Sequence, residues 1–213
     1  MTEEQTTFPP LPPALEAVHI GRGWQKMAQR IFQTLGWRVE GTLPNEPKFV
    51  IAAAPHTSNW DGVLLLLAAT SLGVRLNWIG KHTLFRPPIG WFMRRLGGIP
   101  VDRRKRQNLV DQVAAAFAKR THMILVIATE ATRKEVPYWR SGFYYIALKA
   151  GVPILLAGPD YPTKRIVLGP LIWPSGDIDA DMEKIAAWFN AKGLRGIKGK
   201  PMSPVRLRPR DDA

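Results

Sequence analysis

Cysteine is absent from this 213-residue chain, and long apolar runs are absent too. Without a thiol, the chain cannot form disulfides or thiolate metal sites, and no reaction can pass through an enzyme thioester. The longest apolar run, residues 63–72, has half of the roughly 20 residues that a membrane-spanning helix needs. The first 18 residues are acidic and proline-rich, whereas a secretory signal begins with a basic stretch and an apolar core. We therefore expect neither a transmembrane helix nor a secretory signal.

Acidic residues are also scarce relative to basic ones. Lys and Arg number 30 against 17 Asp and Glu, which gives a formal net charge of +13. Two segments concentrate this charge: residues 94–120 hold eight basic and two acidic residues, and residues 192–213 hold seven and two. The charge implies an acidic partner, namely nucleic acid, anionic lipid head groups, a phosphorylated substrate or an acidic carrier protein. The eight tryptophans favour a membrane–water boundary. Since no zinc-finger, RRM, KH or helix-turn-helix signature is present, nucleic acid is the less favoured partner.

Apolar periodicity predicts an α/β fold, with a mainly parallel or mixed central sheet flanked by helices. We expect a disordered lead at residues 1–13 and one domain at residues 14–213, which includes a basic tail at 193–213. The predicted strands are residues 37–41, 48–54, 75–80, 99–102, 122–128, 152–158 and 164–173, and the predicted helices are residues 14–35, 61–72, a short one within 86–98, 107–119, 143–150 and 179–192.

The first predicted helix, residues 14–35, is amphipathic. One continuous apolar stripe runs along it, and Lys26, Gln29, Arg30 and Gln33 occupy the other side. Such a stripe either packs on the domain or lies in a membrane interface, with basic side chains directed toward lipid phosphates. The stripe consists of Trp24, Met27, Ala28, Ile31, Phe32 and Leu35.

The stretch "PHTSNWD" at residues 55–61 joins a predicted strand to a predicted helix, where ligands of parallel α/β folds bind. His56 and Asp61 would lie about 140° apart on one continuous helix, so they meet only if His56 is in the incoming turn. Ser58 and Asp61 have the spacing of a capping box, which supports that turn. Two interpretations of Asp61 remain open here, because it either caps the helix or orients His56 as a general base.

Four blocks in this sequence resemble those of the glycerophospholipid acyltransferase family, which includes the 1-acyl-glycerol-3-phosphate acyltransferases. "PHTSNWD" contains the family's H-x-x-x-x-D motif. "LGGIPVDRR" at 96–104, "TEATR" at 129–133 and "GVPILLAG" at 151–158 are similar to the second, third and fourth blocks. The four follow in the family's order over residues 48–160, and the flanks resemble the short bacterial members.

The resemblance implies transfer of a fatty acyl group from acyl-CoA or acyl-carrier protein to a lysophospholipid hydroxyl, usually that of 1-acyl-glycerol-3-phosphate. It implies that His56 is the general base and that Asp61 orients it. It further implies that the acceptor's phosphate and head group bind to Arg103, Glu130, Thr132 and Arg133. The family requires no metal and no bound cofactor. Its implied location is peripheral, on the cytoplasmic side of the inner membrane, against an anionic surface.

Two positions in the third block depart from the family pattern. Ala131 stands where the family usually has glycine, and Thr129 replaces the usual proline. If residue 131 has a left-handed backbone, alanine is strained there by roughly 1 kcal/mol or more. Two other functions remain as alternatives to acyl transfer. One is a non-catalytic basic module that binds membranes or nucleic acid, and the less favoured one is a hydrolase that uses Ser58, which lacks a nucleophile elbow.

Overall fold

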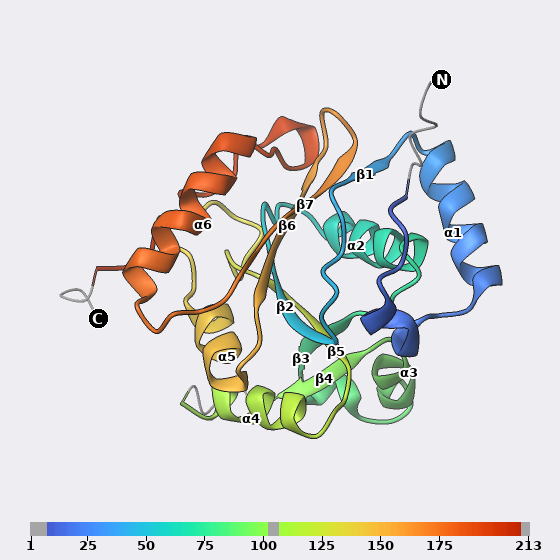
Figure 1. Ribbon diagram of the computed structural model, residues 1–213, viewed down its shortest axis with the longest axis horizontal. Helices are drawn as coiled ribbons and strands as arrows, with labels where there is room; N and C mark the ends of the chain where they lie inside the picture. The colour runs from blue at the N-terminus through green and yellow to red at the C-terminus, as the bar shows by residue number, and fades with distance from the viewer. Residues whose placement is uncertain (1–7, 102–106, 210–213) are drawn as a thin grey trace.

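The computed structural model describes residues 8–101 and 107–209. Its centre is a seven-stranded sheet with the strand order β1-β7-β6-β2-β5-β3-β4 (Figure 1). Every neighbouring pair is parallel except β6 and β7, which are antiparallel. The predicted mainly parallel or mixed sheet is therefore confirmed. The strands are β1 (Arg38–Glu40), β2 (Lys48–Ala53), β3 (Asn77–Lys81), β4 (Gly98–Val101), β5 (Met123–Ala128), β6 (Ile154–Asp160) and β7 (Arg165–Ile172).

Helices cover both faces of this sheet, as Figure 1 shows. Two of them, α1 and α2, lie on one face, and α4, α5 and α6 lie on the other, while the short α3 lies beside the β4 edge. The helices are α1 (Arg22–Thr34), α2 (Trp60–Ser71), α3 (Gly90–Arg95), α4 (Gln107–Ala118), α5 (Gly142–Ala150) and α6 (Ile178–Lys192), and the 3₁₀ turns are η1 (Pro13–Val18), η2 (His82–Phe85) and η3 (Ile197–Gly199).

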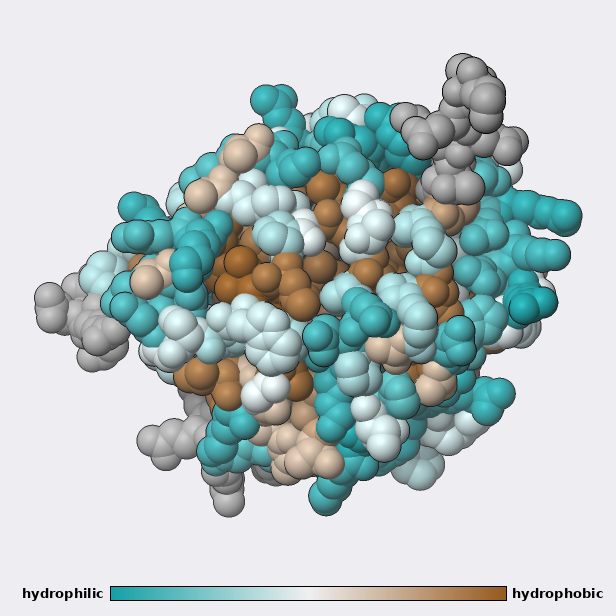
Figure 2. Space-filling model, in the orientation of Figure 1, coloured by the Kyte–Doolittle hydropathy of each residue, from teal (hydrophilic) through white to brown (hydrophobic). Residues whose placement is uncertain are grey.

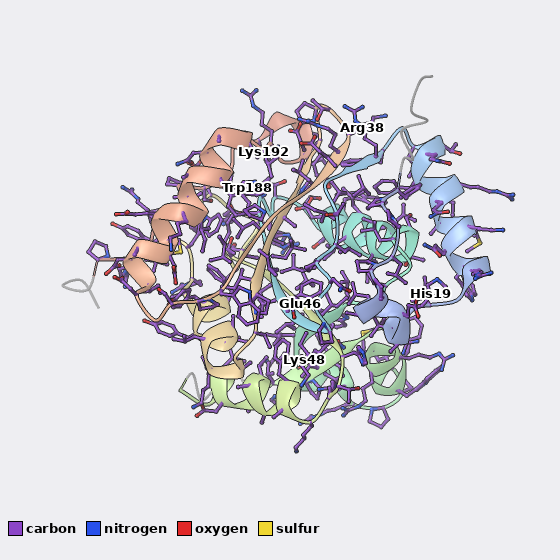
Figure 3. The ribbon with its side chains drawn as sticks, in the orientation of Figure 1. His19, Arg38, Glu46, Lys48, Trp188 and Lys192 are labelled. Atoms are coloured by element: carbon purple, nitrogen blue, oxygen red, sulfur yellow. The ribbon has the colours of Figure 1, made fainter. Side chains whose placement is uncertain are left out.

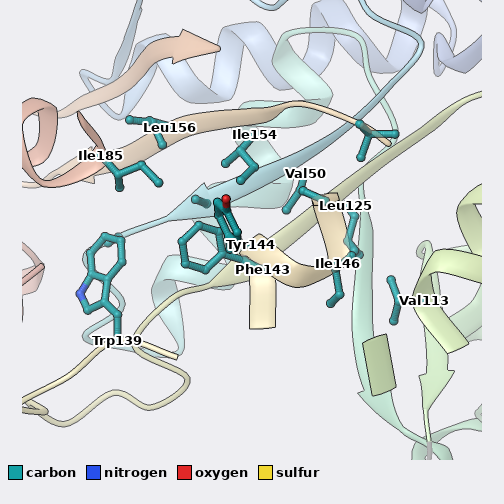
Figure 4. Packing of buried hydrophobic residues seen from close by; sticks show 14 of the residues in the cluster. Val50, Val113, Leu125, Trp139, Phe143, Tyr144, Ile146, Ile154, Leu156 and Ile185 are labelled. Atoms are coloured by element: carbon teal, nitrogen blue, oxygen red, sulfur yellow. The ribbon is translucent and has the colours of Figure 1, made fainter. Parts of the chain in front are cut away.

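The alternation of side chains along β2 divides the core into two layers. Phe49 and Ile51 point into the cluster under α1 and α2, whereas Val50 and Ala52 point into the cluster under α4, α5 and α6. Successive strand residues face opposite sides, so a strand that is apolar at every position fits a sheet covered on both faces. Figure 4 shows the second cluster, in which Tyr144 of α5 packs close to β2 and β6. In the view of Figure 2, apolar side chains reach the surface over the middle of the molecule, and hydrophilic ones predominate toward its edges.

The N-terminal part differs from the single helix predicted over residues 14–35. Residues 13–18 form the 3₁₀ turn η1, and α1 begins only at Arg22. The break has a backbone cause: Gly21 has φ 97°, and Ile20 N donates to Gly73 O in a short bridge between the segments. Part of the lead for which disorder was predicted, residues 8–13, is described in the structure. Phe8 packs on Phe32 with ring centroids 5.8 Å apart, and residues 1–7 lie outside the described part.

The strand order brings three loops to one edge of the sheet. The strands β2, β5 and β6 are adjacent and parallel, so the loops that follow them begin at the same edge. Thr129 N, just after β5, donates to Ala53 O at the end of β2, at 3.2 Å. Figure 3 labels Lys48 at the opposite, amino end of β2, where its Nζ donates to Phe117 O at 3.0 Å. The carboxyl edge of the sheet is therefore where the polar loops of the predicted motifs meet.

Candidate active site

His56 lies in the turn between β2 and α2, and Asp61 lies in the first turn of α2. The His56 Nδ1 is 3.3 Å from the Asp61 Oδ2, with 30% of the histidine side chain exposed and 7% of the aspartate. The predicted geometry, with histidine in the incoming turn and aspartate in the helix, is present. A carboxylate beside Nδ1 favours the tautomer that carries its proton there, which leaves the Nε2 lone pair available as a base.

The Asp61 carboxylate also organises the turn that carries His56. Its Oδ2 accepts hydrogen bonds from Thr57 N at 2.5 Å and Ser58 N at 2.8 Å. The predicted capping box is only half formed. Asp61 accepts from Ser58 N, as that motif requires, but the Ser58 hydroxyl accepts from Trp60 N, at 3.1 Å, and the N-cap residue is Asn59. Capping and orientation of the imidazole are therefore performed by the same carboxylate, and the two interpretations of Asp61 do not compete.

Tyr161 completes the surroundings of this carboxylate. Its hydroxyl donates to Asp61 Oδ1 at 2.6 Å, and its ring packs edge-on against Trp37, with centroids 5.2 Å apart. Burial and the hydrogen bond to Asp61 raise the pKa of Tyr161, so the tyrosine remains a donor. Burial alone would raise the pKa of Asp61, but the hydrogen bonds from His56, Tyr161 and the backbone amides outweigh it, and the pKa lies below its usual value. Asp61 is therefore an anion beside the imidazole at neutral pH.

Glu130 holds the histidine turn from the other side. It follows β5, is buried, and accepts from His56 N through Oε2, at 2.5 Å, and from Ser203 N through Oε1, at 2.9 Å. The resemblance implies that Glu130 binds the acceptor's head group. In the structure, both of its carboxylate oxygens instead accept hydrogen bonds from backbone amides of the site.

The remaining predicted binding residues are placed differently from one another. Arg133 donates from a guanidinium nitrogen to Asn59 Oδ1 at 2.5 Å, which fixes it beside the start of α2. The Thr132 hydroxyl accepts from Lys134 N at 3.4 Å, a local turn contact. Arg103, the predicted phosphate ligand of the second block, lies outside the described residues.

A cavity of about 400 Å³ opens beside the imidazole. Four residues of the predicted blocks or their turn line it together with five that the sequence did not single out. An imidazole held by a carboxylate and open to a cavity that contains Arg133 is the arrangement that separates an enzyme from a non-catalytic binding module. The lining consists of His56, Thr57, Glu130, Arg133, Lys134, Glu135, Lys200, Pro201 and Ser203.

The sequence model of the acyltransferase family matches residues 37–156, which include the first three predicted blocks and most of the fourth. The chain belongs to the acyltransferase family. Its fold is similar to that of the 1-acyl-sn-glycerophosphate (LPA) acyltransferase PlsC from Thermotoga maritima, with a TM-score of 0.58 and 19% sequence identity over 83% of this chain and 81% of that one. A comparison with curated proteins finds no match. In the described residues of this acyltransferase, no cluster of three or more His, Asp or Glu side chains is placed to hold a metal ion.

The acyltransferase site contains residues that the motifs did not indicate. Tyr161 had a positional signal, because it follows the predicted strand of the fourth block at its carboxyl end. Lys200 and Ser203 had none, because they lie beyond α6, outside the family match, and reach the site only through the tertiary fold.

Ala131 lies in the third block between Glu130 and Thr132, and its backbone is left-handed, with φ 54°. The conformation that the glycine pattern suggested is therefore present, and alanine occupies it. A Cβ in this region crowds the following carbonyl and costs about 1–2 kcal/mol.

Replacing Ala131 with glycine is expected to stabilise the acyltransferase by about 0.5–1 kcal/mol. Relief of the Cβ strain exceeds the extra backbone entropy that glycine gives to the unfolded chain. Denaturant unfolding of both proteins measures the difference. Ala115, exposed in α4, is the control, because Ala115→Gly should lower stability by roughly 0.5–1 kcal/mol. Equal losses in the two variants would show that residue 131 is not strained.

Proposed function

We propose that this acyltransferase moves a fatty acyl group from acyl-CoA or acyl-carrier protein to the hydroxyl of a lysophospholipid, with 1-acyl-glycerol-3-phosphate as the first acceptor to test. The observation that carries this proposal is the His56–Asp61 pair at the wall of a cavity that also holds Arg133. The T. maritima protein of similar fold is described as an acyltransferase for that acceptor.

The proposed reaction uses only the two substrates and the side chains of this chain. The acceptor hydroxyl attacks the thioester carbonyl while the His56 Nε2 takes the hydroxyl proton. The new C–O bond forms, the tetrahedral intermediate collapses, and the C–S bond breaks. The imidazolium then returns the proton to the leaving thiolate. Asp61 stabilises the imidazolium during this cycle, because it is an anion 3.3 Å from Nδ1.

A phosphate-bearing acceptor fits the charges beside His56. Arg133, whose guanidinium is anchored by Asn59, and Lys134 both line the cavity. Guanidinium binds phosphate through paired hydrogen bonds, and a lysine adds a compact positive charge. A neutral acceptor would offer these cations no anionic partner of its own.

The test is an acyl-transfer assay with purified protein. Labelled acyl-CoA and acyl-carrier protein are each offered with lysophosphatidate, with other lysophospholipids and with monoacylglycerol, and the products are separated. Transfer to lysophosphatidate in preference to monoacylglycerol supports the proposal. Absence of transfer to every lysophospholipid from both donors would overturn it.

We further propose that α1 docks on a membrane surface. The predicted apolar stripe is divided in the structure: Ala28 and Phe32 are buried in the domain, while the other four side chains point to solvent. Arg22, Lys26 and Arg30 are exposed on the same helix. Exposed apolar side chains flanked by cations fit an anionic lipid interface. In the described part of the chain no helix is both long and apolar enough to span a bilayer. The outward side chains are Trp24 (65% exposed), Met27 (46%), Ile31 (44%) and Leu35 (50%).

Replacing Trp24 and Ile31 together with serine is expected to weaken binding to anionic phospholipid vesicles by about tenfold or more, because each side chain loses apolar burial in the interface. Vesicle co-sedimentation measures this. Gln33→Ser, a substitution on the polar side of α1, is the control and should bind like the unchanged protein. If the double variant binds vesicles as well as the unchanged protein, docking through α1 is refuted. If the unchanged protein is a dimer in solution and the double variant is a monomer, the stripe serves self-association instead.

A further inference from the structure

The cavity beside His56 has a wall that comes from outside the family match. The turn after β2 and the loop after β5 supply the residues expected from the blocks, whereas Lys200, Pro201 and Ser203 come from the chain beyond α6. This C-terminal segment, residues 194–209, contains five Lys or Arg and no Asp or Glu. In Figure 1 it leaves the end of α6 beside the β6–β7 hairpin and returns toward the start of α6.

Two direct contacts fix the C-terminal segment to the histidine turn. Ile197 N donates to Thr57 Oγ1 at 3.0 Å. Gly196 packs so closely that a Cβ there would lie 2.3 Å from the same hydroxyl oxygen. Thr57 is the residue next to His56, so the position of this segment is defined relative to the imidazole.

A second set of contacts fixes the segment to the loop after β5. Ser203 N donates to Glu130, whose other oxygen accepts from His56 N, so one buried carboxylate joins the two parts of the site. Val136 N donates to Ser203 Oγ at 3.2 Å, and Trp139 N donates to Arg206 O at 2.8 Å. Because the C-terminal segment contacts both the histidine turn and the loop after β5, it forms a fixed wall of the cavity.

Lys200 is held within this wall by its own backbone. Gly196 N donates to Lys200 O at 2.8 Å, and Lys200 N donates to Ile197 O at 3.3 Å, which closes a tight turn. Lys200 lines the cavity with Arg133 and Lys134. Within residues 8–101 and 107–209, neither Lys134 nor Lys200 forms an ion pair.

We infer that Lys200 is a specificity-determining residue that binds a phosphate group of a substrate, together with Arg133 and Lys134. Three cations line the cavity against two carboxylates, Glu130 and Glu135. Both oxygens of Glu130 already accept hydrogen bonds from backbone amides. The surplus of positive charge fits an anionic phosphate group. The inference rests on the proposed function, which supplies two sources of phosphate: the acceptor's head group and the phosphopantetheine arm of the acyl donor.

Steady-state kinetics of Lys200→Met, which removes the charge and keeps much of the side-chain length, test this inference. We expect KM for the phosphate-bearing substrate to rise about tenfold, with kcat changed less than about twofold, because ground-state binding is lost. Lys200→Arg should restore KM to within about threefold, because it keeps the charge. Lys198→Met, in the same turn but not lining the cavity, is the matched control and should behave like the unchanged protein.

Phosphate-free substrates identify which phosphate Lys200 binds. If KM rises for lysophosphatidate but not for monoacylglycerol, the phosphate is that of the acceptor. If KM rises for acyl-CoA but not for an acyl-N-acetylcysteamine thioester, it is that of the donor arm. Either result supports the inference. Unchanged KM for every substrate, or an equal rise with and without phosphate, overturns it.

A binding measurement separates this inference from the proposed function. Titration calorimetry with inorganic phosphate compares the unchanged protein with Lys200→Met. If lysophosphatidate is acylated but Lys200→Met matches the unchanged protein in both assays, the inference fails and the function stands. If no lysophospholipid is acylated but phosphate binds in a Lys200-dependent way, the function fails and the phosphate site stands.

Discussion

Replacing His56 with alanine is expected to lower kcat for acyl transfer by about 10³-fold. A positioned general base contributes on the order of 10²–10⁴-fold, and no other side chain in the described lining of the cavity is an imidazole. Acyl transfer from saturating donor to saturating acceptor measures the loss. Substrate affinity should change little, because the cations and the C-terminal segment that line the cavity are retained.

His122→Ala is the matched control for this prediction. Nδ1 of His122 lies 3.0 Å from the Thr121 hydroxyl in an exposed pair, away from the residues that line the cavity, so its loss should leave kcat unchanged. Circular dichroism and thermal melting show whether His56→Ala is folded. A folded His56→Ala protein with undiminished turnover would rule out the histidine as the base.

Replacing Asp61 with asparagine is expected to lower kcat by about 10²–10⁴-fold with the histidine intact. The amide oxygen can still accept from Thr57 N and Ser58 N, so the turn keeps its start, but the anion that stabilises the imidazolium is gone. We expect the free energy of unfolding to fall by roughly 1–3 kcal/mol, since hydrogen bonds to a buried charge are replaced by weaker ones. Activity and denaturant unfolding of the same preparation separate the two effects.

The pH dependence of stability offers a second measure of Asp61. Its pKa in the folded protein lies below its usual value of 3.8, so its carboxylate stabilises the fold above about pH 4. This contribution is lost as the pH falls through the lower, folded pKa. The stability difference between the unchanged protein and Asp61→Asn should therefore shrink as the pH is lowered from neutral toward 3. A difference that stays constant with pH would mean that Asp61 acts only as a neutral hydrogen-bond acceptor.

The fold was largely predictable because each strand and helix carries a local apolar pattern. Residues 122–128, for example, are apolar at nearly every position, which predicts a strand covered on both faces, and β5 has this position in the sheet. The predicted single helix over residues 14–35 was wrong for a tertiary reason. The periodicity continues through residues 19–21, but a bridge between His19 and Val74 and a left-handed Gly21 interrupt the helix there.

The amphipathic stripe of α1 shows a second limit of sequence patterns. Periodicity places Ile31 and Phe32 in the same stripe, yet Phe32 is fully buried and Ile31 is 44% exposed. The packing of α1 against α2 decides which part of the stripe faces the domain. Gln25 and Gln29 contribute to this packing, because both donate to Ser71 O at the end of α2. A hydropathy pattern shows which residues are apolar, but not which neighbouring residue each of them contacts.

The sequence alone predicted the His56–Asp61 pair that we propose as the base and its orienting carboxylate. His56 and Asp61 are five residues apart and span one turn and one helix start, so local geometry sufficed to bring them together. Only the tertiary structure decided what surrounds them. Tyr161 reaches Asp61, and Ser203 reaches Glu130, across 100 and 73 residues of chain. These contacts depend on the order of the strands and on the path of the chain after α6. The spacing of residues within a motif does not predict that path, because the packing of the whole domain determines it.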